Sequence, residues 1–372
     1  MRWVFWGSAL VIAYTYVGYI GWLWLRARLW PWPVVRSRQE PYVSIVMVVR
    51  NEERWLETKL RNLLELDYPP LYQIVVVSDG STDRTEAILR PHADDPRVHV
   101  LMNQLSRGKA SALNDAIAVA AGDVIVFTDV RQKIESGAIR LLMENFADPQ
   151  VGCVSGALML GDLESGEAGK GMGLYWRIEK KIRELESDSG SVVGATGALY
   201  AVRRELLVPI PEGTILDDVY TPMQVVRQKK RVVFDPRARA WDHPDLGAER
   251  EFARKVRTLS GNYQLVQMAP WLLRGENPVR FEFVSHKLLR LAVPFVLVAI
   301  LIASLVLSGP VYRSALALQA AFYGLSLLAG LRLSRGPLAR MADAALTFVV
   351  LNSAAVVAFF NFVTGRKAVW IR

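Results

Sequence analysis

The feature that most constrains this chain is an apolar run near its beginning. Residues 3–25 carry no charge, and the next charged side chain is Arg26. A helix of this length can cross the roughly 30 Å hydrocarbon core of a bilayer. A cleaved signal peptide would be shorter and would end in a small-residue cleavage site. Instead, basic and aromatic residues typical of a membrane interface follow the run, namely Arg26, Arg28, Trp30 and Trp32. The sequence therefore predicts a transmembrane helix over residues 1–27.

Three further apolar stretches lie near the end of the chain, at residues 288–307, 314–331 and 342–363. Asn352 and Asn361 in the last stretch are tolerable where helices pack on one another. Buried helices of a large soluble protein are the alternative, but the lengths and the clustering favour membrane spans. We expect about three transmembrane helices within residues 288–372. They would follow an interfacial segment over residues 265–287, where residues 263–273 suit a helix lying at the membrane surface.

The charge distribution predicts which side of the membrane the middle of the chain faces. The formal net charge is +9, and Lys and Arg are frequent over residues 36–287. Basic segments prefer the cytoplasmic side, so we expect a multi-pass protein of the cell membrane with its central region in the cytoplasm. Four spans would then place the basic C-terminus outside. That conflicts with the charge rule, so the last stretch could instead be re-entrant, or the number of spans could differ by one.

Two further classes of protein are disfavoured by composition. The single cysteine, Cys153, excludes an internal disulfide and a cysteine metal cluster. Basicity could also serve nucleic-acid binding, but the sequence holds no aromatic-basic recognition motif. We therefore expect membrane lipids, and no nucleic acid, among the partners.

Between the apolar ends, strand-like and helix-like segments alternate. Apolar runs over residues 42–49, 74–78, 98–102 and 124–128 are typical of buried parallel strands, and residues 51–66 and 109–121 have helical features. This alternation predicts one α/β domain over residues 41–264 with a parallel, doubly wound sheet. Ligands of such sheets bind beyond the carboxyl ends of the strands. Arg50, Asp79 and Asp129, each at or just past a strand end, should therefore lie along one edge.

Several segments of this domain, taken in order, match a known pattern. The segments VSIVMVVRNEE, IVVVSDGSTDRT, SRGKASALNDAI and VIVFTDVRQ resemble the nucleotide-sugar-binding half of inverting family-2 glycosyltransferases with a GT-A fold. GALYAVRREL, ILDDVYTP and KRVVFDPRARAWD resemble the acceptor half, and FARKVRTLSGN resembles an interfacial motif of membrane-embedded members such as hyaluronan and cellulose synthases. The resemblance covers about residues 42–264. It implies a Rossmann-like, mixed GT-A sheet flanked by transmembrane helices.

The resemblance implies roles for two residues on the donor side. Asp79 would accept hydrogen bonds from the base or ribose of a nucleotide sugar of the UDP or GDP type. Lys109 would offset phosphate charge. A plainer role stays open for each, because Asp79 could cap a helix and Lys109 could be a solvated helix residue.

The resemblance also implies Mg²⁺ or Mn²⁺ at a DxD-type motif, which here reads Asp129-Val130-Arg131. A hard cation with oxygen ligands can stabilise the diphosphate leaving group as a Lewis acid. The first acid is present and the second is replaced by Arg131. Asp129 is therefore the predicted metal ligand and nucleotide contact, with a cap at the strand end as its plainer role. Arg131 could itself offset phosphate charge, or point away.

An inverting transfer needs a general base within hydrogen-bond reach of the acceptor hydroxyl. Leu216-Asp217-Asp218 matches the family's acidic pair, so Asp218 is the predicted base. Asp217 would orient the base or the acceptor. Two acids at the start of a helix could also simply stabilise its N-terminus.

Arg254 and Arg257 match part of a Gln-x-x-Arg-Trp motif of the synthases that the chain resembles. Arg257 would contact the diphosphate, while Arg254 replaces the Gln and Thr258 replaces the Trp. In processive synthases that Trp stacks under the acceptor sugar, so its absence is evidence against processive synthesis. Tyr263 or Trp241 could supply an aromatic platform in its place.

These residues predict an inverting, hexosyltransferase-type enzyme. It would transfer a sugar from a nucleotide-sugar donor to a glycan or lipid-linked acceptor, in the synthesis of cell-surface polysaccharide. Three alternatives stay open. They are a processive polysaccharide synthase that exports its product, a transferase acting on polyprenyl phosphate, and a non-catalytic membrane subunit that binds sugar nucleotides.

Overall fold

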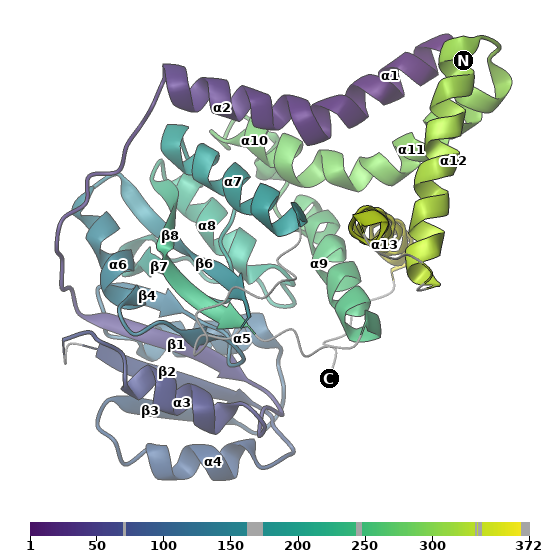
Figure 1. The fold of residues 1–372 in the computed structure, drawn as a ribbon. Helices are drawn as coiled ribbons and strands as arrows, with labels where there is room; N and C mark the ends of the chain where they lie inside the picture. Colours follow the sequence, from purple (N-terminus) through teal and green to yellow (C-terminus); the bar gives the residue numbers. More distant parts are fainter. Residues whose placement is uncertain (70–71, 162–173, 243–247, 332, 334–336, 366–372) are drawn as a thin grey trace. The chain divides into compact units, whose positions relative to one another are not determined.

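The computed structural model describes the chain except residues 70–71, 162–173, 243–247, 332, 334–336 and 366–372 (Figure 1). The chain divides into two compact units. The sheet unit comprises Leu25–Asp245 and Pro270–Arg280, and the helical unit comprises Met1–Trp24, Leu246–Ala269 and Phe281–Ile371.

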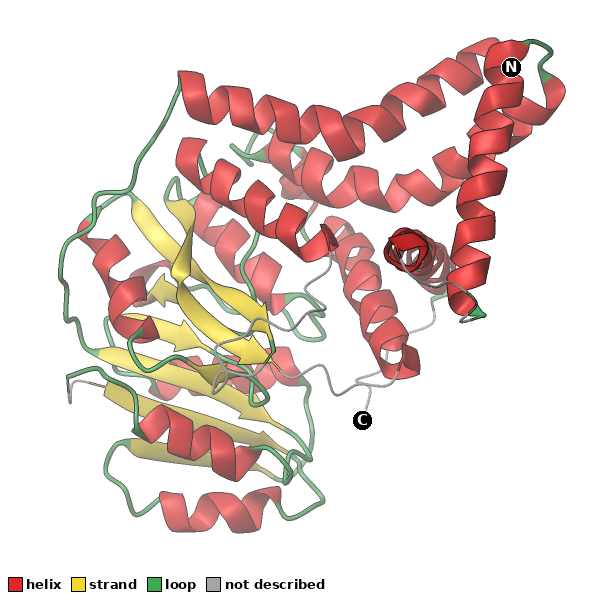
Figure 2. Cartoon of the chain, viewed as in Figure 1, coloured by secondary structure: helices red, strands yellow, loops and turns green. Residues whose placement is uncertain are grey.

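The sheet unit is built on eight strands in the order β3-β2-β1-β4-β7-β6-β8-β5. Strands are drawn in yellow in Figure 2. Strands β1 to β4 run parallel, β7 pairs antiparallel with both β4 and β6, β8 is parallel to β6, and β5 is antiparallel to β8. The sheet is therefore mixed, as the resemblance implied, with an all-parallel half. The strands are β1 Val43–Val49, β2 Tyr72–Asp79, β3 Val98–Asn103, β4 Val124–Phe127, β5 Lys133–Ile134, β6 Val151–Leu160, β7 Tyr200–Arg203 and β8 Arg231–Asp242.

Helices cover both faces of the inner part of the parallel half, which explains why β1, β2 and β4 are buried and mainly apolar. Leu56, Leu60 and Leu63 lie on one face of α3 (Leu56–Leu64) and are fully buried against alternate residues of β1. Burying such a leucine contributes about 1.5–3 kcal/mol. The other helices of the unit are α4 Thr85–His92, α5 Lys109–Val119, α6 Ala138–Glu144, α7 Leu174–Ser189, α8 Asp217–Arg227 and α10 Arg280–Phe283, the last of which crosses into the helical unit; short 3-10 turns lie at Asn145–Ala147, Arg204–Leu206 and Pro270–Leu273.

The segment that enters the sheet unit is fastened to α7 and β8. The Trp32 backbone N–H donates to the Asp188 carbonyl over 2.7 Å. The Arg231 guanidinium donates to the Trp32 carbonyl over 2.7 Å, and its centre lies 4.2 Å from the Trp32 ring centroid. Arg26 donates to Ser189 Oγ over 2.9 Å. Trp32, which the sequence suggested as part of a membrane-interface belt, therefore packs against Arg231 within this unit.

The turn at Pro270–Leu273 packs in the sheet unit as well. Trp271 is buried, and the Arg227 guanidinium of α8 lies 4.9 Å from its ring centroid. The predicted placement of this segment at the membrane surface stays a prediction.

The helical unit contains the predicted apolar stretches. Its helices are α1 Arg2–Ala13, the π-helical turn Tyr14–Gly18, α2 Tyr19–Leu29, α9 Ala248–Met268, the π-helical turn Val284–Leu288, α11 Leu289–Val306, α12 Pro310–Gly330 and α13 Pro337–Val363, of which α2 continues into the sheet unit. Within the described residues, three helical stretches are long and apolar enough to cross a membrane: Arg2–Leu29, Arg280–Val306 and Leu338–Val363. The stretch predicted at residues 314–331 is helical in α12, which is not one of the three. The number of spans stays a prediction.

The two π-helical turns contact each other. The Tyr14 hydroxyl lies 2.9 Å from Ser285 Oγ, which joins the turn between α1 and α2 to the turn before α11. Further along the same pair of helices, Phe5 packs against Ile300 and Ala303. Packed side chains and a polar contact between helices are the interactions expected to hold membrane helices together.

Candidate active site

The carboxyl ends of the parallel strands bring the predicted donor-side residues to one edge. Because β1, β2 and β4 are parallel and in register, β2 ends at Asp79 and β4 ends two residues before Asp129 on the same side. This is the edge of an open α/β sheet where ligands bind.

Asp79 holds a loop in place. It is fully buried, and its carboxylate accepts hydrogen bonds from Ser106 Oγ (2.7 Å), the Arg107 N–H (2.8 Å) and the Gly108 N–H (2.9 Å). The fit is close, since a Cβ added to Gly80 would lie 2.5 Å from the Ser106 nitrogen. Asp79 therefore fixes the segment that leads into α5, and its predicted contact with the nucleotide stays a prediction.

Lys109, the first residue of α5, bridges two of the predicted carboxylates. Its Nζ lies 3.0 Å from Asp129 Oδ1 and 3.3 Å from Asp217 Oδ2. Burial alone would lower the pKa of Lys109, but the attraction of Asp129, Asp217 and Asp218 outweighs it, so the pKa lies above its usual range. The Asp217 side chain is 6% exposed and that of Asp129 is 41% exposed, so Asp129 is the more accessible of the two. The ammonium thus links the donor-side acid to the acidic pair of α8.

Gly197 brings Asp129 and Asp218 to a shared space. The Gly197 N–H donates to Asp218 Oδ2 over 3.2 Å. A Cβ on this glycine would lie 3.1 Å from Asp129 Oδ2 and 3.5 Å from Asp218 Oδ2. The absence of a side chain therefore leaves room for a ligand atom between the predicted metal ligand and the predicted base.

Arg131 lies against another acid. It donates to Asp242 Oδ1 over 2.9 Å, and Gln132 Nε2 donates to Asp242 Oδ2 over 3.0 Å. Asp242 is the last residue of β8, so this ion pair ties the loop after β4 to the acceptor half of the sheet. The sequence left open that Arg131 offsets phosphate charge or points away, and neither role included this pairing with Asp242, which the structure adds.

The described residues fit a divalent cation that one carboxylate and substrate phosphates hold together. Asp129 Oδ1 contacts Lys109, whereas Oδ2 faces the space beside Gly197. In the described part of the chain, no group of three or more His, Cys, Asp or Glu side chains is arranged to hold a metal. Mg²⁺ is commonly held by one or two carboxylates plus substrate phosphates rather than by an all-protein cage. Asp129 can supply the protein's share of that arrangement.

Two charged residues near the site were not singled out from the sequence. Lys59 of α3 is buried and donates to Thr128 Oγ1 (2.8 Å) and to the Gln132 carbonyl (2.6 Å). These hydrogen bonds hold the loop that contains Asp129. Burial lowers the pKa of Lys59 to about 7, against the attraction of Asp129. In the sequence Lys59 looks like a solvated residue between the apolar positions of α3, so no local signal marks it as buried.

Glu52 is the second such residue. Burial raises its pKa to about 7, with Arg131 opposing and the nearby charges of Asp129 and Asp83 reinforcing the shift. It follows β1 on the same edge as the predicted donor-side residues. Asp79 and Asp129 were predicted from their positions at or just after a strand. The same criterion would have identified Glu52.

Tyr200 of β7 also lies near the carboxylates. Its ring stacks on Phe127 with centroids 4.5 Å apart, and burial together with Asp217 and Asp218 raises the pKa of its hydroxyl well above the usual value. Within the described part of the chain that hydroxyl is buried and has no hydrogen-bond partner.

The remaining predicted residues are not part of this cluster of the sheet unit. Arg254 and Arg257 lie on α9 of the helical unit, so their contact with the diphosphate stays a prediction. Tyr263 of the same helix stacks on Phe362, with centroids 5.4 Å apart. Trp241 is buried and donates from Nε1 to Glu135 over 2.7 Å, so it does not offer the open aromatic platform that the sequence suggested.

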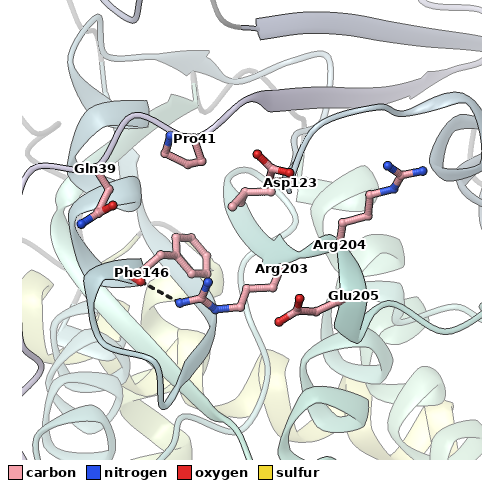
Figure 3. Close-up of a pocket in the computed structure, with 8 residues that line it drawn as sticks. Gln39, Pro41, Asp123, Phe146, Arg203, Arg204 and Glu205 are labelled. Atoms are coloured by element: carbon pink, nitrogen blue, oxygen red, sulfur yellow. Dashed lines mark hydrogen bonds between the residues drawn. The ribbon is translucent and has the colours of Figure 1, made fainter.

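A cavity of about 450 Å³ lies at the opposite edge of the sheet (Figure 3). Asp123 and Val124, at the start of β4, contribute to it, and Arg203 donates there to the Phe146 carbonyl over 2.7 Å. The lining residues are Gln39, Pro41, Asp123, Val124, Phe146, Arg203, Arg204 and Glu205. None of the predicted site residues lines it, so this cavity is separate from the carboxylate cluster.

The fold is that of a GT-A glycosyltransferase. The mannosyltransferase PcManGT from Pyrobaculum calidifontis, solved in complex with GDP-Man and Mn²⁺, superposes with a TM-score of 0.76 at 23% identity, covering 97% of this chain and 99% of that one. At this identity the likeness establishes the fold alone.

Sequence comparison relates part of the chain to one protein family. The model of the family described as Glycosyl transferase family 2 matches residues 44–208, and enzymes of that family are inverting. Curated relatives include a poly-beta-1,6-N-acetyl-D-glucosamine synthase from Staphylococcus aureus, 24% identical over 54% of this chain and 49% of the relative. A beta-monoglucosyldiacylglycerol synthase from Nostoc sp. is 26% identical over 58% of this chain and 48% of the relative. The chain thus spans about half the length of the curated relatives that it matches.

Proposed function

We propose that this chain is a membrane glycosyltransferase that transfers a hexose, with inversion, from a nucleotide sugar to a glycan or lipid-linked acceptor. The observation that carries the proposal is the convergence of Asp129, Asp217 and Asp218 around Lys109 and Gly197, at the ligand-binding edge of a domain that the family-2 model matches. A binding subunit without activity would not require the acid at position 218 to face the same space as Asp129.

The chemistry follows from these positions. The oxygen of the acceptor hydroxyl forms a bond to the anomeric carbon, while the bond from that carbon to the nucleoside diphosphate breaks. Asp218 accepts the proton that the hydroxyl loses. Asp129 would hold Mg²⁺ or Mn²⁺ together with the diphosphate, and the cation supplies Lewis-acid stabilisation of the leaving group. Asp217 orients the Lys109 ammonium toward Asp129. The Gly197 N–H fixes one oxygen of Asp218 and so its direction.

The membrane placement supports an acceptor that is itself at the membrane. Three described helices are suited to span a bilayer, and the basic residues at the end of the first of them and just after it, Arg26, Arg28, Arg36 and Arg38, favour a cytoplasmic sheet unit, where nucleotide sugars are available. The Nostoc relative is named for a lipid product, which supports a lipid acceptor. The Staphylococcus relative is named for a polymer, which keeps a processive synthase as the second candidate. The GDP-Man in the structural neighbour makes GDP-type donors worth testing beside UDP-type donors.

A donor screen tests the proposal. The full chain, purified in detergent with Mn²⁺ and a membrane lipid extract, is incubated with radiolabelled UDP-glucose, UDP-N-acetylglucosamine or GDP-mannose. We expect label in the lipid fraction or in polymer from one donor, and none with Asp218→Asn. Full transfer by Asp218→Asn would overturn the assigned base, and absence of nucleotide-sugar binding would overturn the proposed function. A ladder of products on a gel, rather than one product, would favour the processive synthase.

A further inference from the structure

The carboxylate cluster contains a cation of its own. Lys109 Nζ contacts Asp129 Oδ1 and Asp217 Oδ2, and Asp218 adds to the negative field around it. The Lys109 side chain is 18% exposed, so its charge is only partly screened by water.

The start of α5 holds this ammonium in position. Lys109 directly follows Gly108, whose N–H donates to Asp79 over 2.9 Å, and the N–H of Arg107 donates to the same carboxylate. The Cα of Lys109 is therefore fixed by a fully buried anchor at the end of β2. From this fixed position the Lys109 side chain reaches Asp129 and Asp217 with its Nζ.

A divalent cation bound at Asp129 would lie close to this ammonium. Two like charges at such a distance repel, and the repulsion is stronger near a protein surface than in bulk water. A nucleoside diphosphate changes the balance, because its negative oxygens both offset the Lys109 charge and supply further metal ligands. The metal then no longer depends on Asp129 alone.

The geometry points to Lys109 as a resident counter-cation that makes divalent-metal binding at Asp129 depend on a nucleoside diphosphate. This inference rests on the proposed function only for the nature of the nucleotide. The metal would enter the site with the diphosphate rather than before it. Lys109 would thereby keep the apo protein from holding a bare cation beside the general base.

The test measures Mn²⁺ binding by the electron paramagnetic resonance signal of the free ion. The full chain in detergent is titrated alone, with GDP and with UDP. For the unaltered protein we expect affinity for Mn²⁺ at least about tenfold tighter with one of these nucleotides than without, since removing a repulsion of about 1.4 kcal/mol changes an equilibrium constant tenfold. In Lys109→Met we expect binding of Mn²⁺ alone to become at least about tenfold tighter.

Matched variants test whether the effect comes from the charge at position 109 or from the shape of that side chain, and whether it depends on the position of the lysine. Lys109→Arg keeps the charge and should behave like the unaltered protein. Lys181→Met removes an ammonium that pairs with Glu184 on α7, away from the cluster, and should change nothing. Adding Asp129→Asn to Lys109→Met should abolish the gained binding. Lys109→Gln provides a second neutral variant if the methionine variant does not fold, as judged by circular dichroism.

Two results would overturn the inference. They are Mn²⁺ binding to the unaltered protein as tight without nucleotide as with it, or no gain in either neutral variant that folds. If neither nucleotide binds, the proposed function is in error, while the comparison of Mn²⁺ binding by Lys109→Met and the unaltered protein still decides the role of the ammonium.

Discussion

Two aspartates at the ends of parallel strands on either side of β1 have opposite roles in the structure. Asp79 ends β2, is fully buried, and accepts three hydrogen bonds from the segment Ser106–Gly108. Asp129 follows β4, has a side chain that is 41% exposed, and contacts Lys109 through one oxygen while the other faces the space beside Gly197. In the sequence both appear as an acid after an apolar strand.

The difference teaches that an acid's role depends on which of its oxygens are already engaged. A buried carboxylate is stable only when hydrogen bonds replace its lost hydration. Asp79 meets that condition by accepting hydrogen bonds from a loop, so its hydrogen bonds stabilise the fold. Asp129 keeps an oxygen open to a ligand, and we expect its substitution to affect chemistry more than stability.

The largest effect should come from Asp218→Asn, because Asp218 lies beside Gly197 together with Asp129. Removing a general base costs about 10²- to 10⁴-fold in rate, so we expect kcat to fall by that much. The thermal midpoint should stay within about 2 °C of the unaltered protein, because the amide keeps its shape and can still accept the Gly197 N–H. Steady-state kinetics and a melt in the same detergent check both parts, and retained kcat would show that the base is another residue.

Asp129→Asn should come next. It removes the carboxylate that would share the metal with the diphosphate, and we expect kcat/KM to fall by about 10²-fold, or about 2.7 kcal/mol of transition-state stabilisation. The thermal midpoint should change little. A large loss of stability with nearly normal activity would place Asp129 beside Asp79 as a structural residue and break the comparison.

Asp79→Asn should show the opposite pattern. Its Nδ2 would face N–H donors, and we expect the free energy of unfolding to fall by about 2–3 kcal/mol, since hydrogen bonds to charged groups contribute about 1.5–3 kcal/mol and a buried donor is left unpaired. Denaturant or thermal unfolding measures the loss. An unchanged melt combined with a raised KM for the nucleotide sugar would instead assign Asp79 a direct contact with the donor.

The smallest effect concerns Glu52, on the same edge. Its pKa is raised to about 7 in the folded protein, from an ordinary value near 4.5. Between these two pH values the unfolded chain loses the proton that the folded protein retains, so this residue's contribution to stability falls as the pH rises through that window. Glu52→Gln should therefore gain stability relative to the unaltered protein between pH 4.5 and 7, as followed by thermal midpoints. The contribution is modest because Glu52 is only partly buried, and a constant difference across this range would contradict it.

Much of the fold could be predicted from local pattern. Parallel strands covered on both faces are mainly apolar, so β1, β2 and β4 are visible as apolar runs. The edge that carries Asp79 and Asp129 followed from the direction of those strands. The resemblance implied a mixed sheet, but the antiparallel pairing of β7 with β4 and β6 came only from the structure, since its four residues carry no signal of pairing direction.

The sequence by itself determined which residue types stand at the strand ends and helix starts, because backbone geometry and burial act on neighbouring residues. Only the tertiary structure decided which of them meet. Lys109 pairs with Asp217 across 108 positions of the chain, and Arg131 pairs with Asp242 across 111. Such pairings depend on how distant elements pack, since a charge is offset by whatever lies next to it in space. For the same reason Lys59, one lysine among many in the sequence, is buried beneath the loop of Asp129.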